Sequence, residues 1–136
     1  MVSFTDAMGN TVVLRQHPPQ RIISIVPSIT ELLYDLELDD EVIAITKFCV
    51  HPNEWFTGKT RIGGTKNLNI QKIQTLNPDL IIASKEENVK EQIDELSATS
   101  PVYVTDVKNY REALQMILQV GEITGRKEKG MQLTEE

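Results

Sequence analysis

The segment between Lys47 and Trp55 carries the side chains best suited to bind a large flat molecule. Phe48 and Trp55 lie on either side of His51, so two aromatic faces would flank an imidazole that can ligate a metal or donate a hydrogen bond. This combination suits a large planar ligand. The alternative is that both rings pack in the interior and that His51 is an ordinary surface residue. Because no second nitrogen or sulfur ligand stands at metal-site spacing, we predict no metal site here.

A second candidate is the Gly-Gly-Thr-Lys-Asn segment at 63–67. It superficially resembles a phosphate loop, but it lacks the G-x-x-x-x-G-K-[ST] spacing and does not directly follow a strand, which argues against a nucleotide site. The two glycines would let the backbone approach a ligand closely, and Lys66 could meet a carboxylate or phosphate. A plain turn with a solvated lysine is the alternative.

A third candidate follows the apolar run 80–84, where Lys85 and Glu86 come directly after a predicted strand. Carboxylates stabilise the positive end of a helix, and we expect Glu87 to do only that. Lys85 and Glu86 lie nearer the strand end and could face a cleft. The catalytic motifs G-x-S-x-G and H-E-x-x-H do not occur, and the chain has only two histidines. We therefore predict no catalytic residues, no enzyme activity and no cofactor.

Four β-branched runs must position these candidates. They lie at 22–26, 42–46, 80–84 and 102–104. Nearly continuous apolar runs of this kind are typical of parallel strands that are covered on both faces. Their alternation with helical patterns predicts an α/β fold, a Rossmann-like lobe with a short parallel sheet of about four strands.

Helices are expected where apolar residues repeat every three to four positions after a capping residue. The expected starts are Ser28-x-x-Glu31, Asn69, Ser84-x-x-Glu87 and Asn109-x-x-Glu112. A β-hairpin is expected within residues 4–14, because Gly9 permits a tight turn. Residues 47–69 show no clear helical or strand period, and a short helix is expected only after them, at 70–76. A loop of this length usually binds something. The polar tail 126–136 is expected to begin a helix that buries little apolar surface within this chain.

The candidate segments should converge on one edge of the sheet. In an open α/β sheet, ligands gather beyond the carboxyl ends of the strands, where loops and helix starts meet. The rule nominates the segments 27–30, 47–55, 61–67 and 85–88. We therefore predict one ligand-binding face, and we include Ser28 in it because it follows the first strand of the sheet.

Composition narrows the classes of function. The chain has 136 residues, of which 40% are hydrophobic, and its 20 acidic and 14 basic side chains give a net charge of −6. This charge would repel a phosphate backbone, so nucleic acid is not an expected partner.

The single Cys49 excludes an internal disulfide and is expected to be a packed small residue. No apolar run approaches the ~20 residues that span a bilayer, and Met1–Thr5 lacks the regions of a signal peptide, so we expect a soluble chain.

The order of these segments resembles the cobalamin and iron-siderophore binding proteins of ABC importers, the helical-backbone metal receptors. The resemblance covers nearly the whole chain. It is carried by RIISIVPSITELL at 21–33, LNPDLII at 76–82 and GEITGR at 121–126. In that family two lobes are joined by one long rigid helix. The resemblance implies that residues 1–136 are the N-terminal lobe and that residues 126–136 begin the interlobe helix, with the C-terminal lobe absent.

The resemblance also implies a role for the candidate residues. The family grips a metal chelate (cobalamin, haem or a ferric siderophore) between the lobes and delivers it to an ABC permease in the membrane. Phe48, Thr65 and Lys85 occupy positions from which the cobalamin binders supply aromatics, and only Phe48 keeps that character. Gln71 stands where those proteins place an acidic residue that meets the permease. The family implies a periplasmic or cell-envelope location, and an exposed cleft wall or helix face could drive dimerisation.

Two other functions stay open at this stage. One is a chelatase-like or other Rossmann-like enzyme that uses His51 with Glu86, which predicts turnover with a pH-dependent rate. The other is a protein-interaction module whose acidic surface meets a basic partner, which predicts salt-sensitive association. The binding function instead predicts saturable binding without product.

Overall fold

The central sheet is parallel and has five strands in the order β5-β4-β3-β8-β9. The computed structural model describes residues 1–135. The strands of this sheet are β3 (Ile22–Ser24), β4 (Val42–Ile45), β5 (Thr60–Arg61), β8 (Leu80–Ser84) and β9 (Val102–Thr105). The four predicted strands and the α/β class are confirmed. β5 was missed, because its two residues are exposed and form no apolar run.

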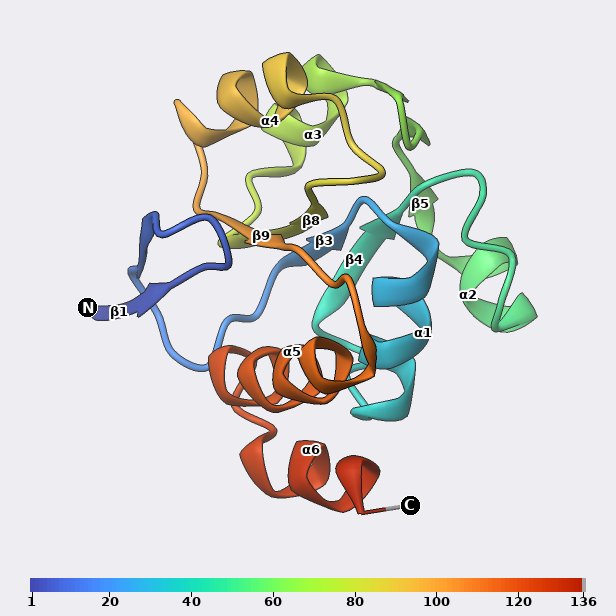
Figure 1. The fold of residues 1–136 in the computed structure, drawn as a ribbon. Coiled ribbons are helices and arrows are strands. Elements are labelled where there is room, and N and C mark those ends of the chain that lie inside the picture. Colours follow the sequence, from blue (N-terminus) through green and yellow to red (C-terminus); the bar gives the residue numbers. More distant parts are fainter. Residues whose placement is uncertain (136) are drawn as a thin grey trace.

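Six helices accompany the sheet within residues 1–135. They are α1 (Pro27–Asp35), α2 (Asn53–Gly58), α3 (Ile70–Leu76), α4 (Lys90–Ser97), α5 (Tyr110–Ile123) and α6 (Lys127–Thr134). From β3 the chain steps to β4 on one side, and from β8 it steps to β9 on the other. Because parallel crossovers are right-handed, these opposite steps place α1 and α4 on opposite faces. Figure 1 shows α3 and α4 above the sheet and α1 and α5 below it.

Two small antiparallel pairs complete the fold. The first is the predicted hairpin of β1 (Val2–Thr5) and β2 (Thr11–Leu14), which turns through Gly9 at φ 80°. The second, β6 (Gly63–Gly64) with β7 (Asn67–Leu68), was not predicted. Asp6 attaches the hairpin to the sheet edge, because its Oδ2 accepts from the Val104 N–H at 3.2 Å.

The core consists of the β-branched strands and the helix faces that cover them. Ile22, Ile23 and the three residues 80–82 are fully buried, as the continuous apolar runs predicted for strands covered on both faces. Leu33 of α1 and Leu36, the C-cap of that helix, are equally buried. Cys49 is 1% exposed, which confirms that it is a packed small residue.

The capping box expected at Ser28 is wrong. α1 begins one residue earlier, at Pro27, and Val26 is its N-cap without a side-chain hydrogen bond. Proline suits the first helical position because its missing N–H would have no partner there. Ser28 therefore lies inside the first turn of α1, exposed, at the edge of the sheet where β3 ends.

The capping box expected at Ser84 is also wrong. Ser84 is the last residue of β8, and α4 begins only at Lys90. Lys85, Glu86 and Glu87 lie in the intervening turn rather than in a helix. The two asparagine caps are confirmed, since Asn69 accepts from the Lys72 N–H and Asn109 from the Glu112 N–H.

The tail buries more than expected. α5 ends before Gly125, whose φ is 79°, and α6 folds back against α5. The two helices cross closely at glycines: a Cβ on Gly130 would lie 3.2 Å from the Ile117 carbonyl oxygen. Gly130 is buried and Leu133 is half-buried, whereas Glu136 lies outside the described residues. None of the described helices has the length and apolar content needed to cross a bilayer.

Candidate ligand-binding site

The order of strands reverses between β3 and β8. β3 pairs with β4 on one side and with β8 on the other, and the chain leaves the two central strands in opposite directions. At such a switch point the loops diverge and leave an opening beyond the carboxyl ends of the strands. The segments that follow β3, β4, β5 and β8 all meet at this edge. They contain Ser28, Phe48, His51, Thr65, Lys66, Lys85 and Glu86.

Phe48 is the one large aromatic ring that these segments expose. It is 56% exposed, and its ring rests on the second glycine of the 63–67 segment: a Cβ on Gly64 would lie 3.1 Å from Phe48 Cε2. The Lys47 N–H donates to the Gly63 carbonyl at 2.9 Å, which holds the two segments together. Lys47 Nζ lies 5.3 Å from the ring centroid. The glycine pair therefore supports an exposed aromatic face with a cation beside it, rather than a phosphate cradle.

A buried group of hydroxyls and a thiol lies beneath Phe48. Thr30 Oγ1 lies 2.8 Å from Ser24 Oγ and 2.9 Å from Cys49 Sγ, and Thr46 Oγ1 lies 3.0 Å from the same sulfur. The Phe48 N–H donates to Thr46 Oγ1 at 3.3 Å. All four side chains are buried. The ends of β3 and β4 are thus linked by side chains, which fixes the backbone from which Phe48 projects.

Asn88 joins three more segments. Its Oδ1 accepts from the Ser84 N–H at 2.8 Å, and its Nδ2 donates to the carbonyl oxygens of Ile25 at 3.1 Å and Thr65 at 2.9 Å. The side chain is buried, with 7% of the residue exposed. Sequence reasoning placed Asn88 in a candidate segment but gave it no role. Two of its hydrogen-bond partners lie in segments distant in the sequence, so no local sequence pattern predicts these bonds.

Lys85 and Glu86 lie exposed after β8. The Lys85 N–H donates to the Thr105 carbonyl at 2.9 Å, and Lys85 Nζ lies 4.0 Å from Asp106 Oδ2. Lys108 Nζ lies 3.7 Å from the same oxygen. Asp106 lies directly after the last residue of β9. It connects Lys85 to the end of β9.

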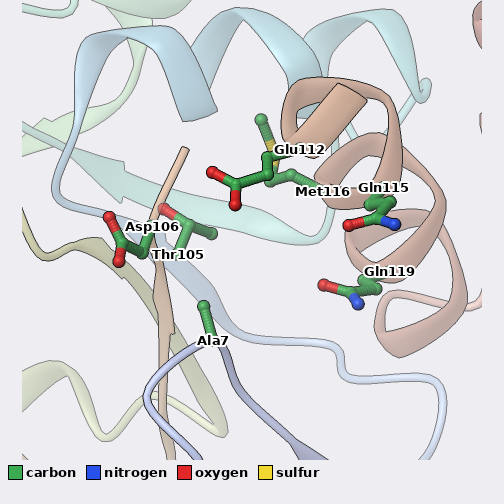
Figure 2. A pocket seen from close by; sticks show the side chains of 7 residues that line it. All are labelled: Ala7, Thr105, Asp106, Glu112, Gln115, Met116 and Gln119. Atoms are coloured by element: carbon green, nitrogen blue, oxygen red, sulfur yellow. The ribbon is translucent and has the colours of Figure 1, made fainter. Parts of the chain in front are cut away.

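A cavity of about 230 Å³ opens beside Asp106, between the end of β9, the hairpin and α5 (Figure 2). Asp106 Oδ1 is buried and has no hydrogen-bond partner among the described residues. The cavity is lined by Ala7, Thr105, Asp106, Glu112, Gln115, Met116 and Gln119. Its lining is mostly polar and its only carboxylates are those of Asp106 and Glu112, so it differs in chemistry from the aromatic face at Phe48.

The remaining predicted residues differ in exposure. His51 and Lys66 are exposed and Thr65 is half-buried. Within the part of the chain that the structure describes, Lys66 forms no ion pair. No hydrogen bond joins His51 to Glu86 among these residues, so the catalytic alternative gains no support. Residues 1–135 also hold no group of three or more His, Cys, Asp or Glu side chains arranged for a metal ion.

Trp55 does not belong to this face. It was expected to flank His51, but it is 2% exposed and lies within α2. Its Nε1 donates to Asp39 Oδ1 at 2.6 Å, its ring meets Tyr34 edge-on at 5.4 Å between centroids, and Lys59 Nζ lies 4.5 Å from the ring centroid. Burial also lowers the pKa of Lys59. The indole is therefore enclosed by these side chains and has no free face for a ligand.

Comparison with known proteins agrees with this architecture. A family described as periplasmic binding protein matches residues 22–136. The chain belongs to the periplasmic binding protein family. The match begins at β3 and so includes every strand of the central sheet and every segment of the ligand-binding face.

Individual relatives extend the match. The chain is 30% identical over 137 residues to an uncharacterized ABC transporter substrate-binding lipoprotein, YvrC, of Bacillus subtilis, covering 97% of this chain and 42% of that protein. The periplasmic vitamin B12 binding protein BtuF of Vibrio cholerae superposes with a TM-score of 0.78 at 28% identity, over 87% of this chain and 46% of that one. Staphylococcus aureus SirA, complexed with staphyloferrin B, has the same fold, with a TM-score of 0.80 at 19% identity over 99% and 46% of the two chains.

The chain spans less than half the length of these relatives. The family and its fold are therefore established for residues 22–136, whereas the activity of a complete relative belongs to roughly twice as much chain.

Proposed function

We propose that this chain forms one wall of the ligand cleft of an ABC importer's substrate-binding protein, and that the ligand is a metal chelate of the cobalamin, haem or ferric siderophore type. The observation that carries the proposal is the exposed Phe48 ring, which rests on Gly64 at the switch point of a periplasmic binding protein fold. An exposed aromatic face with the Lys47 cation beside it suits the flat or ring-shaped surface of such a chelate.

The proposed contacts are those of the converging segments. Phe48 would stack on the chelate, and Lys66 and Lys85 would meet its carboxylates or phosphates. Ser28, His51, Thr65 and Glu86 would supply polar contacts from the same edge. Trp55 is withdrawn from this set because it is buried. The metal would arrive inside the chelate as cargo, so the protein needs no metal ligands of its own.

The relatives support binding followed by delivery. YvrC carries the description of an ABC transporter substrate-binding lipoprotein, so an ABC permease is the proposed partner and the cell envelope the proposed location. A second lobe would close the cleft opposite the Phe48 face. Release to the permease requires no chemical change in the chelate, so we propose binding without catalysis. Dimerisation through an exposed face remains a prediction.

Calorimetric titration tests the proposal. The full-length product of the gene that carries this sequence would be titrated with cyanocobalamin, haemin and a small panel of ferric siderophores, with Phe48→Ala as the matched variant. We expect saturable heat with one class and weaker binding for the variant, because the stacking surface is lost. No heat with any chelate would refute the chelate assignment. Equal affinity in the variant would refute the stacking role.

A further inference from the structure

Asn88 uses its whole amide group to join three segments by hydrogen bonds. Both of its N–H groups donate to backbone carbonyls, of Ile25 and Thr65, and its oxygen accepts from the Ser84 N–H. Only the nitrogen end of an amide can face two carbonyls, so the three partners fix its orientation. These partners lie just beyond β3, within the β6–β7 turn and at the end of β8.

The bond to Thr65 bears directly on the aromatic face. Thr65 follows Gly64, and Gly64 is the residue on which the Phe48 ring rests. A shift of the 63–67 turn would therefore move the support of that ring. The same side chain holds the strand ends on both sides of the switch point, because Ile25 follows β3 and Ser84 ends β8.

We propose that Asn88 is a positioning residue, which sets the geometry of the ligand-binding face by fixing the 63–67 turn against the ends of β3 and β8. The inference rests on the proposed function for its effect on ligand affinity. Its effect on the loops rests on the hydrogen bonds alone. Asn88 itself is buried beneath the face and is not among the proposed ligand contacts.

Two variants distinguish the donor bonds of the Asn88 amide from its acceptor bond. Asn88→Asp keeps an acceptor for the Ser84 N–H but turns an oxygen toward the carbonyls of Ile25 and Thr65, so both donor bonds are lost. Asn88→Ala loses all three bonds. Leu36→Val is the matched control. Leu36 is the fully buried C-cap of α1, and its apolar side chain takes part in no hydrogen bond to these loops, so the substitution should lower stability without removing a bond to them.

Hydrogen–deuterium exchange tests, without any ligand, whether Asn88 holds the 63–67 turn in place. We expect peptides covering 63–68 to exchange faster in both Asn88 variants than in the control, after correction for global stability. The Ser84 amide should exchange faster in Asn88→Ala and stay protected in Asn88→Asp. Unchanged exchange of 63–68 in both folded variants would overturn the proposal.

Affinity for the chelate is the second readout, measured on the full-length protein with cyanocobalamin, haemin and a ferric siderophore as probes. Two lost donor bonds predict about tenfold weaker binding for both Asn88 variants, against little change for Leu36→Val. If the affinity of Leu36→Val falls as much as that of the Asn88 variants, the loss reflects lower stability alone, and the inference is overturned. If the unmodified protein binds none of the probes, the proposed function fails, and the exchange experiment alone decides the role of Asn88.

Discussion

Replacing Trp55 by alanine should lower stability rather than remove a ligand contact. The residue is 2% exposed, and its indole N–H donates to Asp39 at 2.6 Å. Deleting a buried tryptophan side chain typically lowers the free energy of unfolding by ~3–5 kcal/mol. The lost hydrogen bond to a carboxylate accounts for part of this, about 1.5–3 kcal/mol. We expect a total loss of about 4 kcal/mol, a large share of the 5–15 kcal/mol that holds a typical domain together.

Urea unfolding followed by far-ultraviolet circular dichroism measures this loss. Fluorescence cannot serve, because Trp55 is the only tryptophan. Trp55→Phe keeps an aromatic ring and loses the bond to Asp39, so it should be intermediate. Phe48→Ala is the surface control: its ring is 56% exposed, and we expect a change within about 0.5–1 kcal/mol. A Trp55→Ala protein as stable as Phe48→Ala would refute the assignment of Trp55 to the core.

Three further perturbations have defined outcomes. Gly64→Ala places a Cβ 3.1 Å from Phe48 Cε2, so calorimetry should show severalfold weaker chelate binding while the melting temperature changes little. Asn69→Ala removes the cap that accepts from the Lys72 N–H and should lower the free energy of unfolding in urea by about 1 kcal/mol. Burial, with Asp6 and Glu122 nearby, raises the pKa of Tyr103 to about 12. The folded state therefore holds this proton more tightly than the unfolded state, whose pKa is about 10. The contribution of Tyr103 to stability should be retained below pH ~10 and lost towards pH ~12, so Tyr103→Phe should lose less stability over this range than the unmodified protein.

The four predicted strands were predictable because each is a nearly continuous run of apolar residues rich in Val and Ile, and strands buried on both faces typically show that pattern. β5 was not, since Thr60–Arg61 is exposed and is a strand only through its pairing with β4. α2 was not predicted from the sequence for a related reason. It has six residues and a single buried side chain, Trp55, so it shows no helical period.

The candidate segments were predictable to a similar extent. The carboxyl ends of parallel strands meet at one edge whatever the side chains are, so the segments that converge there follow from the strand order. Which side chains are exposed depends on distant partners. Trp55 is enclosed in part by Asp39, 16 positions away, which accepts from its indole N–H. Asn88 donates to Ile25 and Thr65, which lie 63 and 23 positions earlier in the sequence. No local sequence pattern predicts such a contact.

The helix starts show how one residue can override a pattern. Ser28-x-x-Glu31 has the form of a capping box. Pro27 fits the first helical position, however, and moves the start of α1 so that Ser28 is no longer the cap. At Asn69 and Asn109 no proline competes, and both side chains form the expected bonds.

A hydrogen-exchange footprint of the full-length protein, with and without the chelate that binds, tests the central claim most directly. We predict that the chelate slows exchange in the segments 46–51, 63–67 and 84–88, which follow β4, β5 and β8 at the switch point. Residues 34–41, at the opposite end of α1, should exchange at the same rate in both states. Protection confined to residues outside these three segments, with Phe48 and its neighbours unchanged, would contradict the account.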